Sequence, residues 1–209
     1  MTMEIIAQGA ESCVYKIKKW GKTFAMKSRP MKGYLLPEID KSIRSRRTSR
    51  ECKMLTYVRQ LGVPTPAVYS IDMTNHIIIM DYIEGKQLKE LVGNLPKKKL
   101  VVLCRRFGQF MGIMHNADVV HGDPTTSNVI MDSASKMWFV DFGLAEKNAT
   151  VEMKGVDLHL IRRALETTHW DYQDTMFEAT IEGYTQTVGP QSTELFSRMD
   201  SIRERGRYH

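Results

Sequence analysis

The sequence lacks any long apolar run. No stretch of its 209 residues approaches the roughly 18 consecutive apolar residues that a membrane-spanning helix needs. It opens Met1-Thr2-Met3-Glu4 and passes into an apolar segment without the basic start and apolar core of a secretory signal. We therefore expect an intracellular protein, cytoplasmic with the nucleus left open, and no membrane among its partners.

Cysteine is scarce as well. The three cysteines, Cys13, Cys52 and Cys104, lie far apart, and none forms the close C-x-x-C pair of zinc and redox sites. This spacing favours reduced, partly buried thiols. Internal repeats and low-complexity segments are also missing, and the 42% hydrophobic and 26% charged fractions are those of a folded globular chain.

Basic residues exceed acidic ones, which gives a formal net charge of +6 at pH 7. This excess permits an acidic partner such as RNA, because Lys and Arg gain affinity by neutralising phosphates. Two basic stretches stand out: positions 41–53, and the end of the chain with Arg198, Arg203, Arg205 and Arg207. Such stretches are more often a solvated helix face and a polar terminus, so charge alone does not require nucleic acid.

Apolar periodicity predicts two lobes. Strands are expected at 4–7, 13–17, 23–27, 68–71 and 76–82, and a helix from Ile39 to Leu61. After a natural hinge at Glu84-Gly85, we expect a long helix closing near His115, short strands at 129–131 and 138–140, and helices beyond Glu152. The pattern predicts an α+β fold with a strand-rich N-lobe at 1–83, a reduced helical C-lobe at 84–209 with a basic tail, and a ligand cleft between them.

The strongest motif joins the segment 121–128, HGDPTTSN, to the triplet 141–143, DFG. Each alone is more often an ordinary turn, but both in order around a hairpin indicate the catalytic arrangement of the protein-kinase fold. Phosphoryl transfer needs a divalent metal on the phosphates, and oxygen ligands from Asn128 and Asp141 suit Mg²⁺. Asp123 would accept a proton from an attacking hydroxyl or orient an attacking water.

The N-lobe supplies the residues that such a site still needs. Lys27 ends the third predicted strand, as the phosphate-binding lysine of kinases does, and Glu51 on the following helix is placed to pair with it. A lysine at a strand end is more often only solvated, so this hypothesis leans on the downstream motif. The other residues expected around ATP are a turn with one glycine (Gln8, Gly9, Ala10, Glu11), a lid over adenine (Val14), a residue at the back of the pocket (Met80), and two backbone contacts (Asp81, Ile83).

The peptide-binding part of regulated protein kinases is missing. Between Gly143 and the helix that carries Asp157 there are only positions 144–156, with no A-P-E triplet and no room for an activation segment. Thr125 stands two residues after Asp123, where most kinases that phosphorylate Ser or Thr carry Lys. A conventional peptide substrate is therefore not expected.

Over nearly its full length the sequence resembles the small atypical kinase subunit of the KEOPS (EKC) complex, the PRPK-type family. Besides the motifs above, the resemblance rests on Tyr15, Arg29, Lys32, Tyr34, Pro37, Asp40, Arg47-Thr48, Leu144, Val151-Glu152, Lys154, Val156-Asp157-Leu158, Arg163-Ala164, Thr168-His169 and Arg205-Gly206-Arg207. Departures from the family pattern, such as Pro124 and Met153, remove no phosphate or metal ligand.

The resemblance implies a function. Members of this family resemble kinases yet act chiefly as ATPases that support a partner enzyme making threonylcarbamoyl-adenosine in tRNAs that read codons beginning with A, and they also autophosphorylate on Ser or Thr. It implies ATP and Mg²⁺ as cofactors and Lys27 and Asp123 as catalytic residues. It also implies KEOPS subunits as partners, chiefly the threonylcarbamoyl-transferase subunit, and leaves contact with tRNA open.

Two kinds of alternative remain. Small atypical kinases of the RIO type and antibiotic phosphotransferases also use a His-x-Asp and a metal-binding Asp, and the block from Lys27 to Glu51 argues against both. A pseudokinase that only scaffolds a complex belongs to a different class. The complete set of predicted catalytic and metal-binding residues disfavours it, and magnesium-dependent ATP hydrolysis separates an enzyme from a scaffold.

Overall fold

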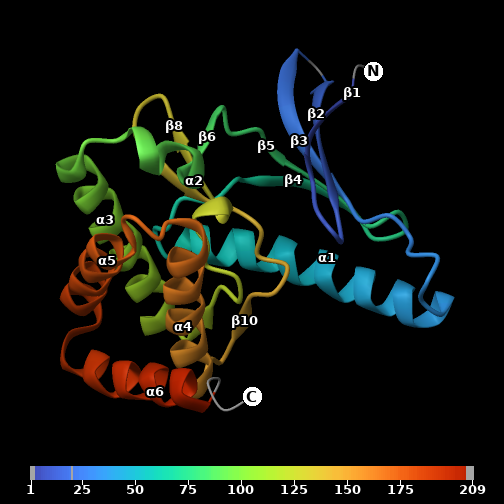
Figure 1. The fold of residues 1–209 in the computed structure, drawn as a ribbon. Coiled ribbons are helices and arrows are strands. Elements are labelled where there is room, and N and C mark those ends of the chain that lie inside the picture. Colours follow the sequence, from blue (N-terminus) through green and yellow to red (C-terminus); the bar gives the residue numbers. More distant parts are fainter. Residues whose placement is uncertain (1–2, 20, 206–209) are drawn as a thin grey trace.

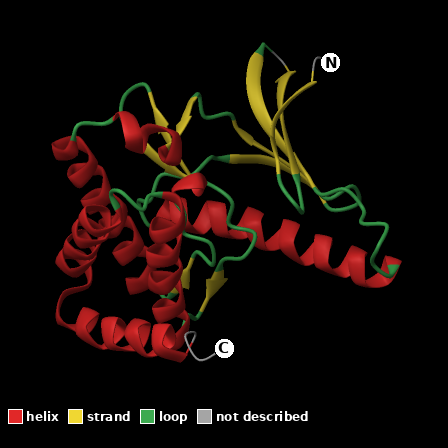
Figure 2. Cartoon of the chain, viewed as in Figure 1, coloured by secondary structure: helices red, strands yellow, loops and turns green. Residues whose placement is uncertain are grey.

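Antiparallel strand pairing builds the N-lobe, as the computed structural model of residues 3–19 and 21–205 shows (Figures 1 and 2). The sheet has the order β1-β2-β3-β5-β4. Its strands are β1 (Met3–Gln8), β2 (Cys13–Lys19), β3 (Lys22–Ser28), β4 (Val68–Asp72) and β5 (Ile77–Asp81). The strands predicted for this lobe are all present, and each bound lies within a few residues of the prediction.

Helix α1 (Pro37–Gln60) runs from beneath these strands into the helical lobe (Figure 1). Pro37 is tolerated in its first turn because the backbone N–H groups there have no partner within the helix. Beyond its end, Gly62 takes a φ of 89°, which glycine adopts without strain. Two polar residues, Thr48 and Glu51, are completely buried on this helix, so its inner face is not purely apolar.

The C-lobe is mainly helical. Its elements are β6 (Gly85–Gln87), α2 (Leu88–Leu91), α3 (Lys97–Asn116), β7 (Val119–Val120), β8 (Val129–Asp132), β9 (Met137–Phe139), β10 (Glu146–Lys147), α4 (Val151–Thr168), α5 (Gln173–Val188) and α6 (Ser192–Arg205). The predicted long helix, hairpin and three later helices are present. None of the helices in the described ranges is both long and apolar enough to cross a membrane.

The joint between the lobes is more fixed than a free hinge. Gly85 begins β6 and pairs with Asp132 of β8, and a Cβ at this position would lie 2.2 Å from the carbonyl oxygen of Met131. Short strands and turns of this kind carry too few residues to show periodicity, so β6, α2, β7 and β10 were not predicted. A single cluster of buried apolar side chains extends from Ala25 in the sheet to Met199 on α6.

Helices α3 and α5 approach each other closely through two glycines. A Cβ on Gly183 would lie 1.9 Å from the carbonyl oxygen of Arg105, and one on Gly108 would lie 1.9 Å from that of Thr180.

We expect Gly183→Ala to lower the free energy of unfolding by about 1–3 kcal/mol, because the backbones must move apart. Urea denaturation measures this change.

Gly93→Ala is the matched control, since a Cβ there meets nothing within 4 Å. Equal stability of the two variants would show that the helices can separate at no cost.

Candidate active site

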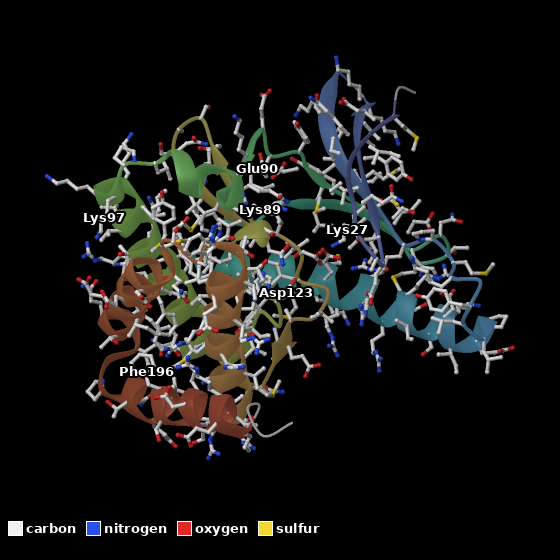
Figure 3. The ribbon with its side chains drawn as sticks, viewed as in Figure 1. Lys27, Lys89, Glu90, Lys97, Asp123 and Phe196 are labelled. Carbon is white, nitrogen blue, oxygen red and sulfur yellow. The ribbon has the colours of Figure 1, made fainter. Side chains whose placement is uncertain are left out.

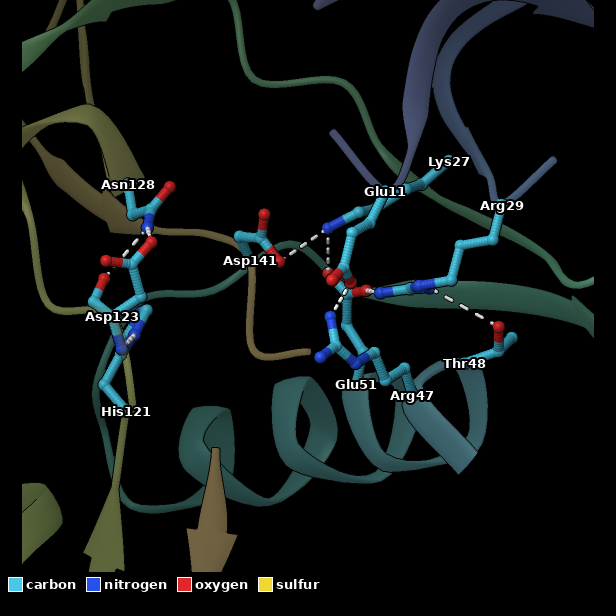
Figure 4. Close-up of polar contacts among 10 residues, drawn as sticks. All are labelled: Glu11, Lys27, Arg29, Arg47, Thr48, Glu51, His121, Asp123, Asn128 and Asp141. Carbon is cyan, nitrogen blue, oxygen red and sulfur yellow. Dashed lines mark hydrogen bonds and ion pairs between the residues drawn. The ribbon is translucent and has the colours of Figure 1, made fainter. Parts of the chain in front are cut away.

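Three charged side chains meet where β3, α1 and the turn after β9 come together (Figure 4). The Nζ atom of Lys27 lies 2.8 Å from Oε1 of Glu51 and 2.7 Å from Oδ1 of Asp141. The side chains of Lys27 and Glu51 are 3% and 0% exposed, whereas that of Asp141 is 47% exposed. The structure therefore makes the Lys27–Glu51 pair expected from the sequence and joins it to the DFG aspartate.

The second oxygen of Glu51 binds an arginine that was not among the predicted site residues. Nη2 of Arg29 lies 2.5 Å from Oε2 of Glu51, and Nη1 of Arg29 donates to Thr48 Oγ1 at 3.4 Å. Gly143 lies beside this guanidinium, because a Cβ there would be 3.0 Å from Nη2 of Arg29. The spacing could have revealed Arg29, because residues two apart along extended chain point to the same side.

Asn128 and His121 hold the predicted proton acceptor, Asp123. The amide nitrogen of Asn128 donates to Oδ2 of Asp123 at 2.8 Å and to the backbone oxygen of Asp123 at 2.9 Å. Neither bond involves the amide oxygen of Asn128. The backbone N–H of Asp123 donates to Nδ1 of His121 at 3.3 Å. Burial lowers the pKa of His121 despite the surrounding carboxylates, so its ring stays neutral and able to accept this bond.

Asp157 of α4 anchors the same loop from behind. This carboxylate is 1% exposed and accepts hydrogen bonds from the backbone N–H groups of His121 at 2.7 Å and Gly122 at 2.9 Å. Gly122 has a φ of 81°, a conformation that glycine permits. Asp157 was not among the site residues predicted from sequence, because its anchoring contact joins segments 36 residues apart.

Two adjoining cavities contain the predicted binding residues. The main cleft, of about 600 Å³, is lined by Gln8, Val14, Lys27, Glu51, Met80, Asp81, Ile83, Asn128 and Asp141. The side cavity, of about 310 Å³, is lined by Gly9, Ala10, Glu11 and Asp123 and shares Asp141 with the main cleft. Both volumes suit small-ligand sites. A larger groove of about 780 Å³, between α1 and β10, contains none of these residues.

Other contacts refine the predicted roles around the cleft. The backbone N–H of Asp81 donates to Ala67 O at 2.9 Å, so this N–H is already engaged within the sheet. Its carboxylate accepts from Tyr69 and from the backbone of Ala67. Lys89 and Glu90 on α2 also line the main cleft and were not predicted (Figure 3).

Asp141 and Asn128 fit a metal whose other ligands come from a nucleotide. Partial removal from water raises the pKa of Asp141, but the charge and hydrogen bond of Lys27 outweigh this effect and hold the pKa below its ordinary value. The carboxylate is therefore ionised at neutral pH. Within residues 3–19 and 21–205, no group of three or more His, Cys, Asp or Glu side chains could hold a metal. Mg²⁺ commonly binds through one or two protein oxygens plus phosphates.

The segment after Gly143 is short and tied down. Strand β10 pairs with β7, Glu146 Oε1 lies 2.6 Å from Nη1 of Arg50, and α4 begins at Val151 after its N-cap, Thr150. Only positions 144–150 separate Gly143 from this helix. The structure therefore contains no activation segment at this place.

Six arginines of the basic stretches form ion pairs within the chain. On α1, ion pairs join Arg44 to Asp40, Arg47 to Glu11 and Arg50 to Glu146. On α6, they join Arg198 and Arg205 to Glu152, and Arg203 to Glu166. Arg207 lies outside the described residues. These pairs give both stretches a structural role within the chain.

Comparison with known proteins gives a family and close relatives. The model of the RIO domain matches residues 7–166. The KEOPS complex subunit Bud32 of Pyrococcus abyssi is 41% identical over 99% of this chain and 96% of its own length. Probable bifunctional tRNA threonylcarbamoyladenosine biosynthesis proteins of Methanobrevibacter smithii and Methanocaldococcus jannaschii are 36% and 33% identical over 98% of this chain. The chain spans only 36% and 37% of the length of those two proteins.

The RIO-domain match covers the segment that was expected to set this chain apart from RIO-type kinases. The block from Lys27 to Glu51 was expected to argue against the RIO type, but the matched region includes that whole block. RIO-type kinases are therefore relatives of this chain and not a separate alternative.

The anchoring role of Asp157 is testable. Asp157→Asn replaces one of two accepting oxygens by an N–H₂ group that faces a backbone donor, so we expect the free energy of unfolding to fall by about 1–3 kcal/mol. Nucleotide turnover should fall too, because the loop carrying Asp123 loses its support. Urea denaturation and an ATP hydrolysis assay measure the two effects, with Asp174→Asn, exposed on α5, as the control. Unchanged stability would contradict the anchor.

Proposed function

Because the chain belongs to the RIO-domain family and, within it, to the Bud32-type KEOPS subunits, we propose that it is an ATP-dependent phosphotransferase and ATPase that supports threonylcarbamoyl-adenosine formation in tRNA. The observation that carries this proposal is the convergence of Lys27, Glu51 and Asp141 on a cleft that also contains Asn128. Asp123 lies on the adjoining side cavity. These are the parts that phosphoryl transfer requires.

We assign binding and orientation as follows. Lys27, held by Glu51, binds the phosphates, and Asp141 with the amide oxygen of Asn128 holds Mg²⁺, which supplies neutralising charge on the phosphates. Val14 and Met80 line the apolar part of the cleft, where the adenine ring would lie. The cofactors are thus ATP and Mg²⁺.

Asp123 receives the proton in the proposed reaction. The oxygen of a water or hydroxyl forms a bond to the γ-phosphorus, and the bond to the bridging oxygen breaks with its electron pair leaving on ADP. The proton of the attacking oxygen passes to the Asp123 carboxylate. The hydrogen bond from Asn128 to Oδ2 of Asp123 fixes the direction of that carboxylate.

Other KEOPS subunits are the proposed partners, chiefly the threonylcarbamoyl-transferase subunit. The relatives named as bifunctional are much longer than this chain, which covers 36% of the Methanobrevibacter smithii protein. The name of the Pyrococcus abyssi relative, which this chain covers over 96% of its length, supports a partner within the KEOPS complex. Direct contact with tRNA is not part of the proposal.

Replacing Asp141 separates an ATPase from a scaffold. We expect Asp141→Ala to reduce magnesium-dependent ATP hydrolysis by about 100-fold or more, because it removes a charge-stabilising ligand. The melting temperature should change little, since this side chain is 47% exposed. Asp200→Ala, exposed on α6, controls for loss of one carboxylate. Undiminished hydrolysis by the folded Asp141→Ala protein would contradict the catalytic assignment. Inactivity of the unmodified protein would favour a scaffold.

The short connection at 144–150 also predicts poor use of peptides. With [γ-³²P]ATP, label should appear as free phosphate or on the protein's own hydroxyl groups far more than on added generic peptides. The reason is that the described residues include no activation segment to hold a peptide beside Asp123. Measuring the three products in one reaction tests this. Efficient, sequence-selective labelling of a peptide would contradict the prediction.

A further inference from the structure

The side cavity is placed to receive the group that is transferred. It shares Asp141 with the main cleft and is also lined by Asp123, the proposed proton acceptor. A phosphoryl group that reacts beside both carboxylates must therefore enter this cavity. Among its lining residues, two carry positive charge, Arg29 and Arg47.

The reacting phosphoryl group needs positive charge here. Its transition state spreads negative charge over three equatorial oxygens, and fixed cations stabilise that charge. The backbone N–H of Thr125 donates to the backbone oxygen of Asp123 at 2.9 Å, so the two residues belong to one tight turn. At the position of Thr125, most kinases that phosphorylate Ser or Thr carry a lysine. The loop that carries Asp123 therefore supplies no cation two residues on.

The two arginines of the side cavity differ in how firmly they are held. Arg29 has a side chain that is 4% exposed, and its guanidinium is bound to the buried Glu51 and Thr48. Arg47 is 27% exposed and pairs with Glu11, which is 52% exposed, on the turn between β1 and β2. Such partly exposed ion pairs contribute only about 0–1 kcal/mol, so Arg47 can change partner at little cost.

Helix α1 gives Arg47 a fixed starting point. It stands four residues before Glu51, on the same face of the helix, and Glu51 is held by Lys27 and Arg29. Figure 4 shows Glu11 reaching from its turn to Arg47, beside this cluster. The Glu11 carboxylate is thus the ion-pair partner of Arg47, the cation that faces the side cavity.

We propose that Arg47 is a further catalytic residue, which binds the γ-phosphoryl group and stabilises its charge during transfer, and that Glu11 is the counter-ion it releases when ATP binds. This inference rests on the proposed phosphotransferase activity. A guanidinium can bind two oxygens of a phosphate at once, and such charge-assisted bonds are stronger than neutral ones. When Arg47 exchanges Glu11 for the phosphate, its positive charge serves the side cavity, and Glu51 keeps both Lys27 and Arg29 as partners.

The test compares Arg47→Ala with Arg46→Ala, which removes the same charge from an exposed site on the same helix. We expect Arg47→Ala to lower kcat for magnesium-dependent ATP hydrolysis by about 100-fold or more. It should also weaken ATP binding by about 10-fold or more while leaving ADP binding unchanged, because only ATP has the γ-phosphate. Arg46→Ala should match the unmodified protein. Calorimetry with each nucleotide and Mg²⁺ measures the affinities, and circular dichroism verifies folding.

Glu11→Gln distinguishes partner exchange from a structural tie. If Glu11 competes with the phosphate for Arg47, its neutralisation should tighten ATP binding, opposite to the effect of Arg47→Ala. Equal weakening of ATP and ADP binding by both variants would show a structural tie and overturn the proposal. Arg47→Gln, which keeps part of the side-chain stem, repeats the comparison if the alanine variant unfolds.

The binding measurements also keep this inference separate from the proposed function. An unmodified protein that binds ATP without hydrolysing it would overturn the catalytic role and the proposed activity together. Normal hydrolysis with an ATP-to-ADP affinity ratio unaffected by Arg47→Ala would overturn the role of Arg47 alone.

Discussion

The carboxylate of Glu51 is the fixed point on which the site depends. It has no exposure to solvent, and each of its oxygens binds a different cation, Lys27 at 2.8 Å and Arg29 at 2.5 Å. A buried ion loses several kcal/mol of hydration, and removing one partner of a buried pair leaves an uncompensated charge. Lys27 lies in β3 and Arg29 directly follows that strand, whereas Glu51 belongs to α1. The contacts that neutralise the carboxylate therefore also hold the helix against the sheet.

This arrangement explains how the site can be assembled without an activation segment. In regulated protein kinases, that segment controls the position of the helix that carries the glutamate. Here Arg29 gives Glu51 a second permanent partner, and Arg50 ties the same helix to Glu146 on β10. Helix α1 is thus joined to the sheet and to the segment after the DFG triplet by contacts within the chain, so no modified loop is needed to place it.

Local patterns predicted the fold and the main site residues because their information lies within short stretches. Strand alternation, the helical spacing of α1 and the two motifs around the β8–β9 hairpin need no distant partner. The sequence could not place contacts between distant segments, such as Asp157 with the backbone of His121, 36 residues away. It also could not decide whether the basic stretches were free, because the acids that pair with Arg47 and Arg203 lie on other elements.

The contact between Lys27 and Asp141 links the two lobes across the cleft, and both groups have a second use. In the proposed reaction Lys27 would keep Glu51 as a partner on turning to a phosphate. Asp141 is half exposed, so exchanging its lysine for a metal would leave no buried charge alone. Buried charges are costly chiefly when they lose a partner. The charges that join the two lobes are therefore the ones to which the proposed function assigns Mg²⁺ and phosphate, and they would receive these ligands with little rearrangement.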